Sequence, residues 1–94
     1  MAGGLQESEG KLSDKVKDLH RAIVSLVEEL EAVDWYNQRA EVCRDKELQN
    51  ILIHNRDEEK EHAAMLLEWI RRNDSGFDKE IKDYLFTDKP IAHK

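Results

Sequence analysis

Glu59 and His62 stand at two positions where the surrounding pattern calls for apolar side chains. They are three residues apart, so on a helix both side chains lie on one face about one turn apart and could bind one ion. Burying an isolated carboxylate is costly, and a bound cation removes that cost. The pair therefore predicts a Glu-x-x-His metal motif.

The spacing alone is a weak signal, because Glu58 and Glu61 also surround His62 in a helix rich in acidic residues. A second carboxylate, Glu29, lies beside the apolar positions of the preceding segment. In an antiparallel hairpin that turns near residue 44, Glu29 stands about 15 residues before the turn and Glu59 about 15 after it. We expect both at the same height.

One chain thus supplies one lone Glu and one Glu-x-x-His, whereas a di-iron four-helix bundle uses two of each. A twofold homodimer would complete the set, and two copies of Glu29 and Glu59 carry the four negative charges that two divalent ions cancel. Carboxylates with one imidazole per metal favour iron or manganese over structural zinc. Two irons per dimer would support oxidation of Fe(II) to Fe(III).

Two alternatives remain open. A metal-free interaction module would dimerise and dock onto a partner, with Glu59 and His62 paired to Arg39 or Lys60 across the dimer. A structural zinc or calcium site would bind metal without turnover.

The first long element is predicted from a cap at Ser13 or Asp14 to about Arg39 or beyond. Its apolar residues alternate four and three positions apart, the pattern of a bundle-forming helix. They are Leu12, Val16, Leu19, Ile23, Leu26, Leu30 and Val33.

A polar turn at residues 43–46 is followed by a second predicted helix, from about Glu47 to Arg72, that ends at residues 73–76. The same spacing continues along it through Leu48, Leu52, Asn55, Glu59, His62, Leu66 and Trp69. Met65 and Trp69 are interpreted as core residues rather than as an electron-transfer path.

Beyond Gly76, apolar residues at helical spacing predict a short third helix that Pro90 ends. The fold class is therefore all-α: an antiparallel two-helix hairpin plus a short C-terminal helix, dimerising into a four-helix bundle. The predicted domain spans residues 12–91, between a flexible tail at 1–11 and a short tail at 92–94.

Composition narrows the class of protein further. With 94 residues, 21 of them acidic and 15 basic, the chain is one acidic domain too small to cover its own apolar surface. Dense Lys/Arg clusters are absent from the sequence, which argues against nucleic acid as a ligand. No apolar run reaches a membrane span of about 18 residues, and no signal peptide is evident. We expect a cytoplasmic protein, with no role assigned to the single Cys43.

Three stretches resemble the encapsulated ferritins of bacteria. They are HRAIVSLVEELEAVDWY at His20–Tyr36, HNRDEEKEHAAMLLEWIRR at His54–Arg72 and DYLFTDKPI at Asp83–Ile91. The resemblance covers roughly residues 12–91. It implies a ferritin-like protomer with a di-iron ferroxidase centre at a homodimer interface, the dimers forming a ring-shaped decamer.

Carried over by motif, the resemblance implies Glu29, Glu59 and His62 as ferroxidase ligands, with Tyr36 beside them as a catalytic contact. Secondary metal positions on the path of approaching iron correspond to Glu28, Glu31 and Trp35. Ca, Zn or Mn are expected to substitute for iron.

The family also implies a location inside an encapsulin nanocompartment, where the ferric product mineralises within the shell. Family members usually end in a flexible tail with a capsid-docking peptide, and nothing after Pro90 resembles one. The encapsulin shell as a partner is therefore an expectation from family resemblance.

Overall fold

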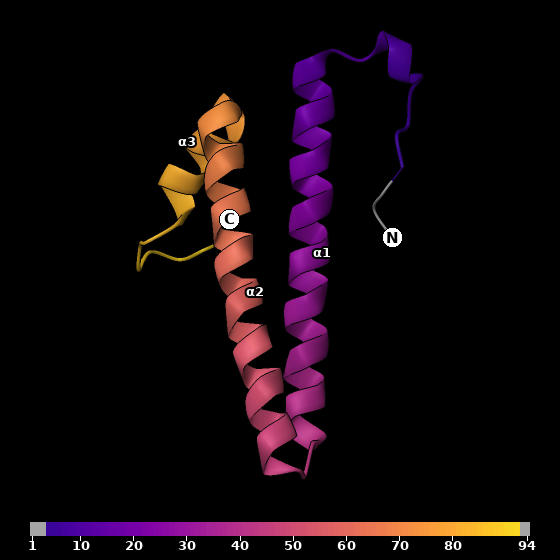
Figure 1. Ribbon diagram of the computed structural model, residues 1–94. Helices are drawn as coiled ribbons and strands as arrows, with labels where there is room; N and C mark the ends of the chain where they lie inside the picture. The colour runs from indigo at the N-terminus through magenta and orange to yellow at the C-terminus, as the bar shows by residue number, and fades with distance from the viewer. Residues whose placement is uncertain (1–3, 93–94) are drawn as a thin grey trace.

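The computed structural model describes residues 4–92, which form a helical hairpin with a short third helix folded against it (Figure 1). After one 3₁₀ turn at Glu9–Lys11, α1 runs over Asp14–Val42, α2 over Lys46–Asn73 and α3 over Ser75–Tyr84. No strand occurs among these residues. The all-helical class predicted from the sequence is confirmed.

Helix α1 begins where its sequence provides a cap. The Ser13 hydroxyl accepts a hydrogen bond from the Val16 backbone N–H at 3.2 Å, which satisfies one of the unpaired donors of the first turn. The helix continues to Val42, three residues past the predicted Arg39, because Ala40 is still buried against α2. Cys43 then adopts an extended conformation and ends it.

Helix α2 starts after a turn of only three residues, 43–45. The Asp45 carboxylate accepts from the Leu48 N–H at 2.9 Å and caps the new helix. The observed helix extends one residue beyond each of the predicted approximate bounds, Glu47 and Arg72, which agrees with the prediction. Such a short connection forces the two helices to lie antiparallel and in contact.

The break between α2 and α3 is shorter than predicted. Only Asp74 leaves the helical conformation, and its carboxylate accepts from the Phe77 N–H at 2.9 Å. Gly76 therefore lies within the first turn of α3 rather than ending α2. At the other end, α3 stops at Tyr84, and Phe86 has a positive φ of 59° that turns the chain away. The prediction that Pro90 ends this helix is wrong.

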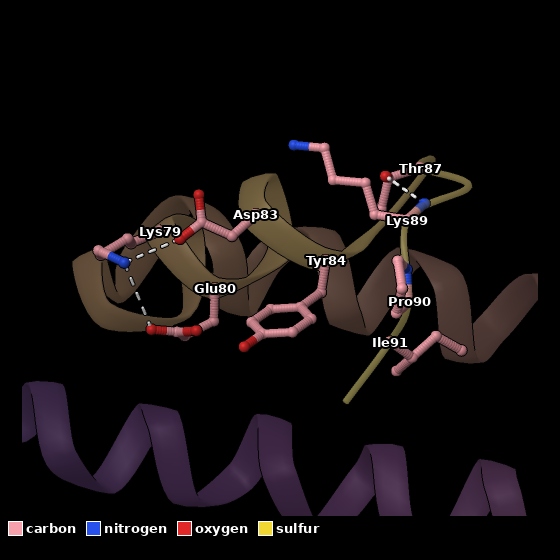
Figure 2. Close-up of a pocket in the computed structure, with 8 residues that line it drawn as sticks. All are labelled: Lys79, Glu80, Asp83, Tyr84, Thr87, Lys89, Pro90 and Ile91. Atoms are coloured by element: carbon pink, nitrogen blue, oxygen red, sulfur yellow. Dashed lines mark hydrogen bonds and ion pairs between the residues drawn. The ribbon is translucent and has the colours of Figure 1, made fainter. Parts of the chain in front are cut away.

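The segment after α3 turns back along it, so that Pro90 and Ile91 line a shallow pocket together with Tyr84 (Figure 2). Of the tail predicted at 1–11, residues 1–3 lie outside the described residues, and so do 93 and 94 of the predicted C-terminal tail. The stretch 4–8 is exposed and not helical, and it leads into the 3₁₀ turn.

The hairpin buries few residues. In the described chain the buried apolar residues are Ala22, Ala40, Ala63 and Ile70. Met65 and Trp69 are exposed, at 57% and 40%, so their prediction as core residues is wrong for a single chain. Three of the seven residues in the first predicted apolar stripe are exposed as well, namely Val16, Ile23 and Leu30. Two helices cover only one side of each other, which leaves a broad apolar face open.

Helix α3 is attached to α2 through Arg71, whose guanidinium donates to Glu68 at 2.7 and 2.8 Å and also to Asp78 of α3. Hydrogen bonds from Arg71 and Arg72 lower the pKa of Glu68 to about 2. Lys82 and Arg71 likewise lower the pKa of Asp78. The acidic groups at this end of the molecule are thus neutralised by the chain's own cations.

Candidate metal centre

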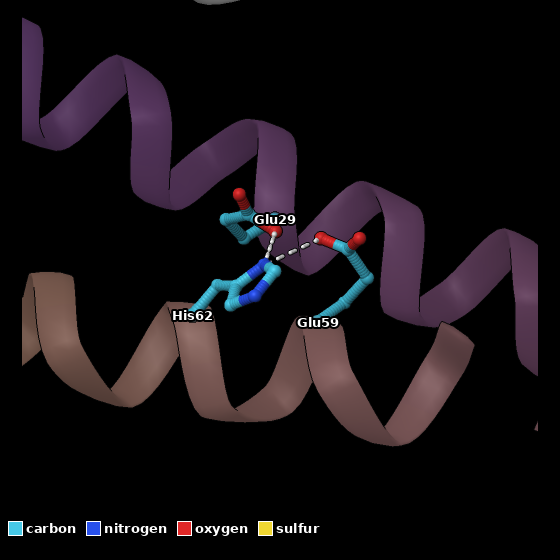
Figure 3. A group of neighbouring side chains, drawn as sticks. All are labelled: Glu29, Glu59 and His62. Atoms are coloured by element: carbon cyan, nitrogen blue, oxygen red, sulfur yellow. Dashed lines mark ion pairs between the residues drawn. The ribbon is translucent and has the colours of Figure 1, made fainter. Parts of the chain in front are cut away.

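Glu29, Glu59 and His62 converge between the two long helices (Figure 3). Glu29 comes from α1, whereas Glu59 and His62 come from successive turns of α2. The antiparallel packing places position 29 level with positions 59–62. The structure thus brings together the three residues expected to meet, and we call this group the half-site.

The half-site has the dimensions of a metal-binding cluster. His62 Nδ1 lies 3.5 Å from Glu29 Oε2 and 3.6 Å from Glu59 Oε2. One ligand atom from each of the three residues lies within 4.8 Å of the others. Small side-chain movements would bring all three to the bond lengths of about 2.0–2.2 Å that first-row metals require.

One carboxylate oxygen of the half-site has no hydrogen-bond partner. Glu29 Oε2 is buried and accepts no hydrogen bond in the structure. The side chains of Glu29 and Glu59 are about a quarter exposed, at 25% and 23%, while His62 is 41% exposed. An unsatisfied buried carboxylate oxygen is costly, and a cation beside it would remove that cost. The donor set of two carboxylates and one imidazole fits iron or manganese.

The half-site is also incomplete, because three ligand groups leave positions free on any metal that prefers five or six donors. His62 is the least buried of the three residues, so the cluster opens toward the surface on its side. A second copy of the same chain would supply the remaining ligands from that direction.

The other residues predicted for the site lie outside this cluster. The Tyr36 ring is half-buried, with the Arg39 guanidinium carbon 5.5 Å from its centroid. Trp35 is 50% exposed, Glu28 is exposed and Glu31 is half-buried. Among residues 4–92, the group of ligating side chains within metal range has Glu29, Glu59 and His62 as its members. The roles of Tyr36, Trp35, Glu28 and Glu31 stay predictions.

The cations named in the metal-free alternative have other partners within the chain. Lys60 Nζ lies 3.5 Å from Asp57 Oδ1, and Arg39 stacks over Tyr36. These contacts lie within one chain, whereas the metal-free alternative involves ion pairs across a dimer, so that alternative stays a prediction.

The sequence analysis missed a hydrogen bond between the helices. Arg56 Nη1 donates to Asn37 Oδ1 at 3.1 Å, joining α2 to α1. The register that placed Glu29 opposite Glu59 places Asn37 opposite about residue 51, more than one turn before Arg56 on α2. The long Arg56 side chain makes the contact, and that register did not predict it. Neither residue type marks a metal site, and the pair was therefore passed over.

A family model described as EncFtn-like matches residues 4–88, which is nearly the whole chain. The chain belongs to the EncFtn-like family, the encapsulated ferritins. This confirms the resemblance found in the three sequence stretches.

Relatives and a solved structure agree with this membership. The chain is 60% identical over 81 residues to an encapsulated ferritin-like protein of Rhodospirillum rubrum, which covers 86% of the chain and 58% of that relative. The chain thus spans little more than half the length of the relative. It is 55% identical over 92 residues to a ferritin-like protein of Thermotoga maritima, covering 98% of the chain and 81% of that protein.

A protein from Nitrosomonas europaea whose crystal structure is known is 72% identical in sequence to this chain. It superposes with a TM-score of 0.91 and covers 96% of this chain and 99% of that one.

Among residues 4–92, no helix has both the length and the apolar character that crossing a membrane requires.

Proposed function

We propose that this encapsulated ferritin is a ferroxidase, in which two copies of the chain pair so that their half-sites face each other. Each copy contributes Glu29, Glu59 and His62. Together they would hold two irons in a four-helix bundle, the arrangement of ferritin-like di-iron proteins. The observation that carries this proposal is the buried Glu29 Oε2 that has no hydrogen-bond partner beside a second carboxylate and an imidazole.

The open apolar face of the hairpin supports the pairing. Exposed apolar side chains extend along both helices, at Val16, Ile23 and Leu30 of α1 and at Met65 and Trp69 of α2. Single exposed apolar residues are ordinary, but a face of this length favours association. A second hairpin would cover it and turn two helices into four.

Iron is the substrate of the proposed reaction. Each Fe(II) loses one electron to dioxygen or peroxide and becomes Fe(III). The chain's residues bind and orient the metal, and their carboxylates neutralise its charge. Four carboxylates in the dimer balance two divalent ions, while neutral His62 adds affinity without adding charge. Ca, Zn or Mn would bind the same ligands without this oxidation of iron.

Glu28, Glu31 and Trp35 are proposed to line the path along which Fe(II) reaches the half-site, with Tyr36 contacting a ligand. The exposure of Glu28 and Trp35 is consistent with a place on that path. We further propose that the dimers form a ring-shaped decamer in the cytoplasm, enclosed by an encapsulin shell in which the ferric product mineralises. The printed name of the Rhodospirillum rubrum relative, encapsulated ferritin-like protein, supports the shell as a partner.

The direct test follows ferric absorbance after Fe(II) is added in air. We expect Glu29→Gln, Glu59→Gln and His62→Ala each to slow oxidation on the order of 100-fold, because each removes a ligand. Glu58→Gln is the matched control, since Glu58 is the exposed neighbour of Glu59 and pairs with His54 instead. It should leave the rate unchanged.

Three other outcomes would overturn the proposal. Oxidation at the background rate of Fe(II) in buffer, with metal still bound, would favour a structural zinc or calcium site. No metal binding at all would favour the metal-free interaction module. Equal loss in Glu58→Gln and Glu59→Gln would mean that the effect is general acidity rather than the half-site.

A further inference from the structure

Polar contacts join α1 to α2 at three levels of the hairpin. Nearest the turn, Gln49 Nε2 donates to the Ala40 carbonyl at 2.8 Å. In the middle, Arg56 Nη1 donates to Asn37 Oδ1 at 3.1 Å. Farthest from the turn, His62 Nδ1 lies 3.5 Å from Glu29 Oε2 in the half-site. Among the described residues, the Asn37–Arg56 bond is therefore the cross-helix hydrogen bond closer to the proposed metal ligands.

The Arg56 guanidinium is held in place on its own helix. Its Nε donates to Asp57 Oδ1 at 3.0 Å while its Nη1 reaches across to Asn37. The side chain is only 24% exposed. A planar guanidinium has donors in a fixed fork, so bonding to Asp57 on one edge fixes the direction of the other. The bond to Asn37 therefore constrains how the two helices are oriented.

The fully buried apolar side chains of the hairpin are mostly small. Three of the four buried residues are alanines, Ala22, Ala40 and Ala63, and they are distributed over both helices. Methyl groups make shallow contacts that allow one helix to tilt or shift against the other, whereas a directional polar contact specifies register. The three-residue turn fixes the helices only at their joined ends.

The half-site needs close control of this geometry. Asn37 is eight residues from Glu29, or about 12 Å along α1. An axial shift by one residue, about 1.5 Å, would be a large displacement of Glu29 relative to Glu59 and His62, because metal–ligand bonds are only about 2.0–2.2 Å long. Any tilt that begins at the turn becomes larger at the half-site, because the half-site lies farther from the turn than Asn37 does.

We propose that Asn37 and Arg56 are positioning residues for the metal centre, whose cross-helix hydrogen bond holds Glu29 within reach of the metal bound by Glu59 and His62. The bond touches neither metal nor ligand. Its effect is to preorganise the three ligands, so that metal binding does not have to bring the helices into place. This inference rests on the proposed function for its metal but not on the oxidation step.

The test measures Co(II) binding to the full chain by calorimetric titration, together with the visible absorption of the bound Co(II), which reports its ligands. Asn37→Leu removes the acceptor at similar size, and we expect it to weaken Co(II) binding on the order of 10-fold and to alter the absorption band. Asn37→Asp keeps an oxygen acceptor for Arg56 and should restore both. Asn50→Leu replaces an exposed amide on α2 instead and is the control for introducing an apolar residue at the surface.

A merely structural role predicts a different result. If Asn37→Leu lowered the unfolding temperature but bound Co(II) as tightly as the unchanged chain, or if Asn37→Asp failed to restore affinity, the inference would be overturned. The ferroxidase proposal would survive that result. Conversely, tight Co(II) binding without Fe(II) oxidation in the unchanged chain would overturn the ferroxidase proposal and leave the positioning role standing. No Co(II) binding in the unchanged chain would overturn both.

Discussion

The carboxylates of Glu68 and Asp78, at the α2–α3 end of the molecule, contact the guanidinium of Arg71. Those of Glu29 and Glu59, in the middle of the hairpin, lie 3.5 and 3.6 Å from the imidazole of His62. Both clusters contain two acidic groups, but Arg72 and Lys82 also contact the first pair. In the first, Arg71 is always charged and donates to both carboxylates. In the second, one buried oxygen accepts no hydrogen bond at all.

The difference separates acidic groups that the chain's own cations neutralise from the acidic groups that we propose bind metal. Where the sequence supplies an arginine in the adjacent turn, the acidic groups attach one helix to the next. Where it supplies a histidine and leaves one side of the cluster open, the carboxylates can still bind a cation from outside the chain. A cluster of acidic side chains does not by itself indicate a metal site. A buried carboxylate oxygen without a hydrogen-bond partner in the chain is the feature that supports one here.

The largest expected difference between the two clusters is in how their variants respond to metal. Saturating Co(II) at about 100 times its dissociation constant should raise the unfolding temperature of the unchanged chain on the order of 10 °C. Glu29→Gln should abolish that increase, whereas Glu68→Gln should keep it despite a lower starting temperature. Thermal unfolding with and without Co(II) checks this. The comparison fails if Glu68→Gln loses the response or Glu29→Gln retains it.

Association should also depend on metal. Without metal, four carboxylates facing each other across two chains repel, so we expect the chain to shift toward dimers and larger rings when Fe(II) or Co(II) is added. Size-exclusion chromatography with metal, and again after chelation, measures this shift. Glu29→Gln with Glu59→Gln removes the repulsion and should pair without metal. Identical elution profiles in all samples would argue against metal binding at the interface.

The smallest expected effect is at the Arg71 cluster in acid. The folded-state pKa of Glu68, about 2, is below its ordinary value of 4.5, so its contribution is fully present above about pH 4.5 and is lost as pH falls through about 2. Because these groups are exposed, the loss is modest. The NMR signal of the Glu68 side-chain carboxyl carbon should move over this range, and in Arg72→Gln, which removes one of its two donors, it should move at a higher pH. A shift at neutral pH would contradict this origin.

Much of the helical structure was predictable because it is local. Ser13 caps α1, and the Glu59–His62 spacing places both side chains on one face because a helix repeats every 3.6 residues. The third helix was less predictable at its ends. Asp74 acts both as the end of α2 and as the cap of α3, and the positive φ of Phe86 ends the element before Pro90 is reached. Neither follows from apolar spacing.

The sequence by itself determined the family, the helices and the choice of Glu29, Glu59 and His62 as proposed ligands. Only the tertiary structure decided that Glu29 Oε2 is buried without a partner, that Arg56 reaches Asn37 and that Met65 and Trp69 stay exposed in one chain. The reason is that caps and periodicity depend on neighbours within one turn. Contacts between helices depend on tilt, register and side-chain rotamer, which a periodic pattern leaves undetermined.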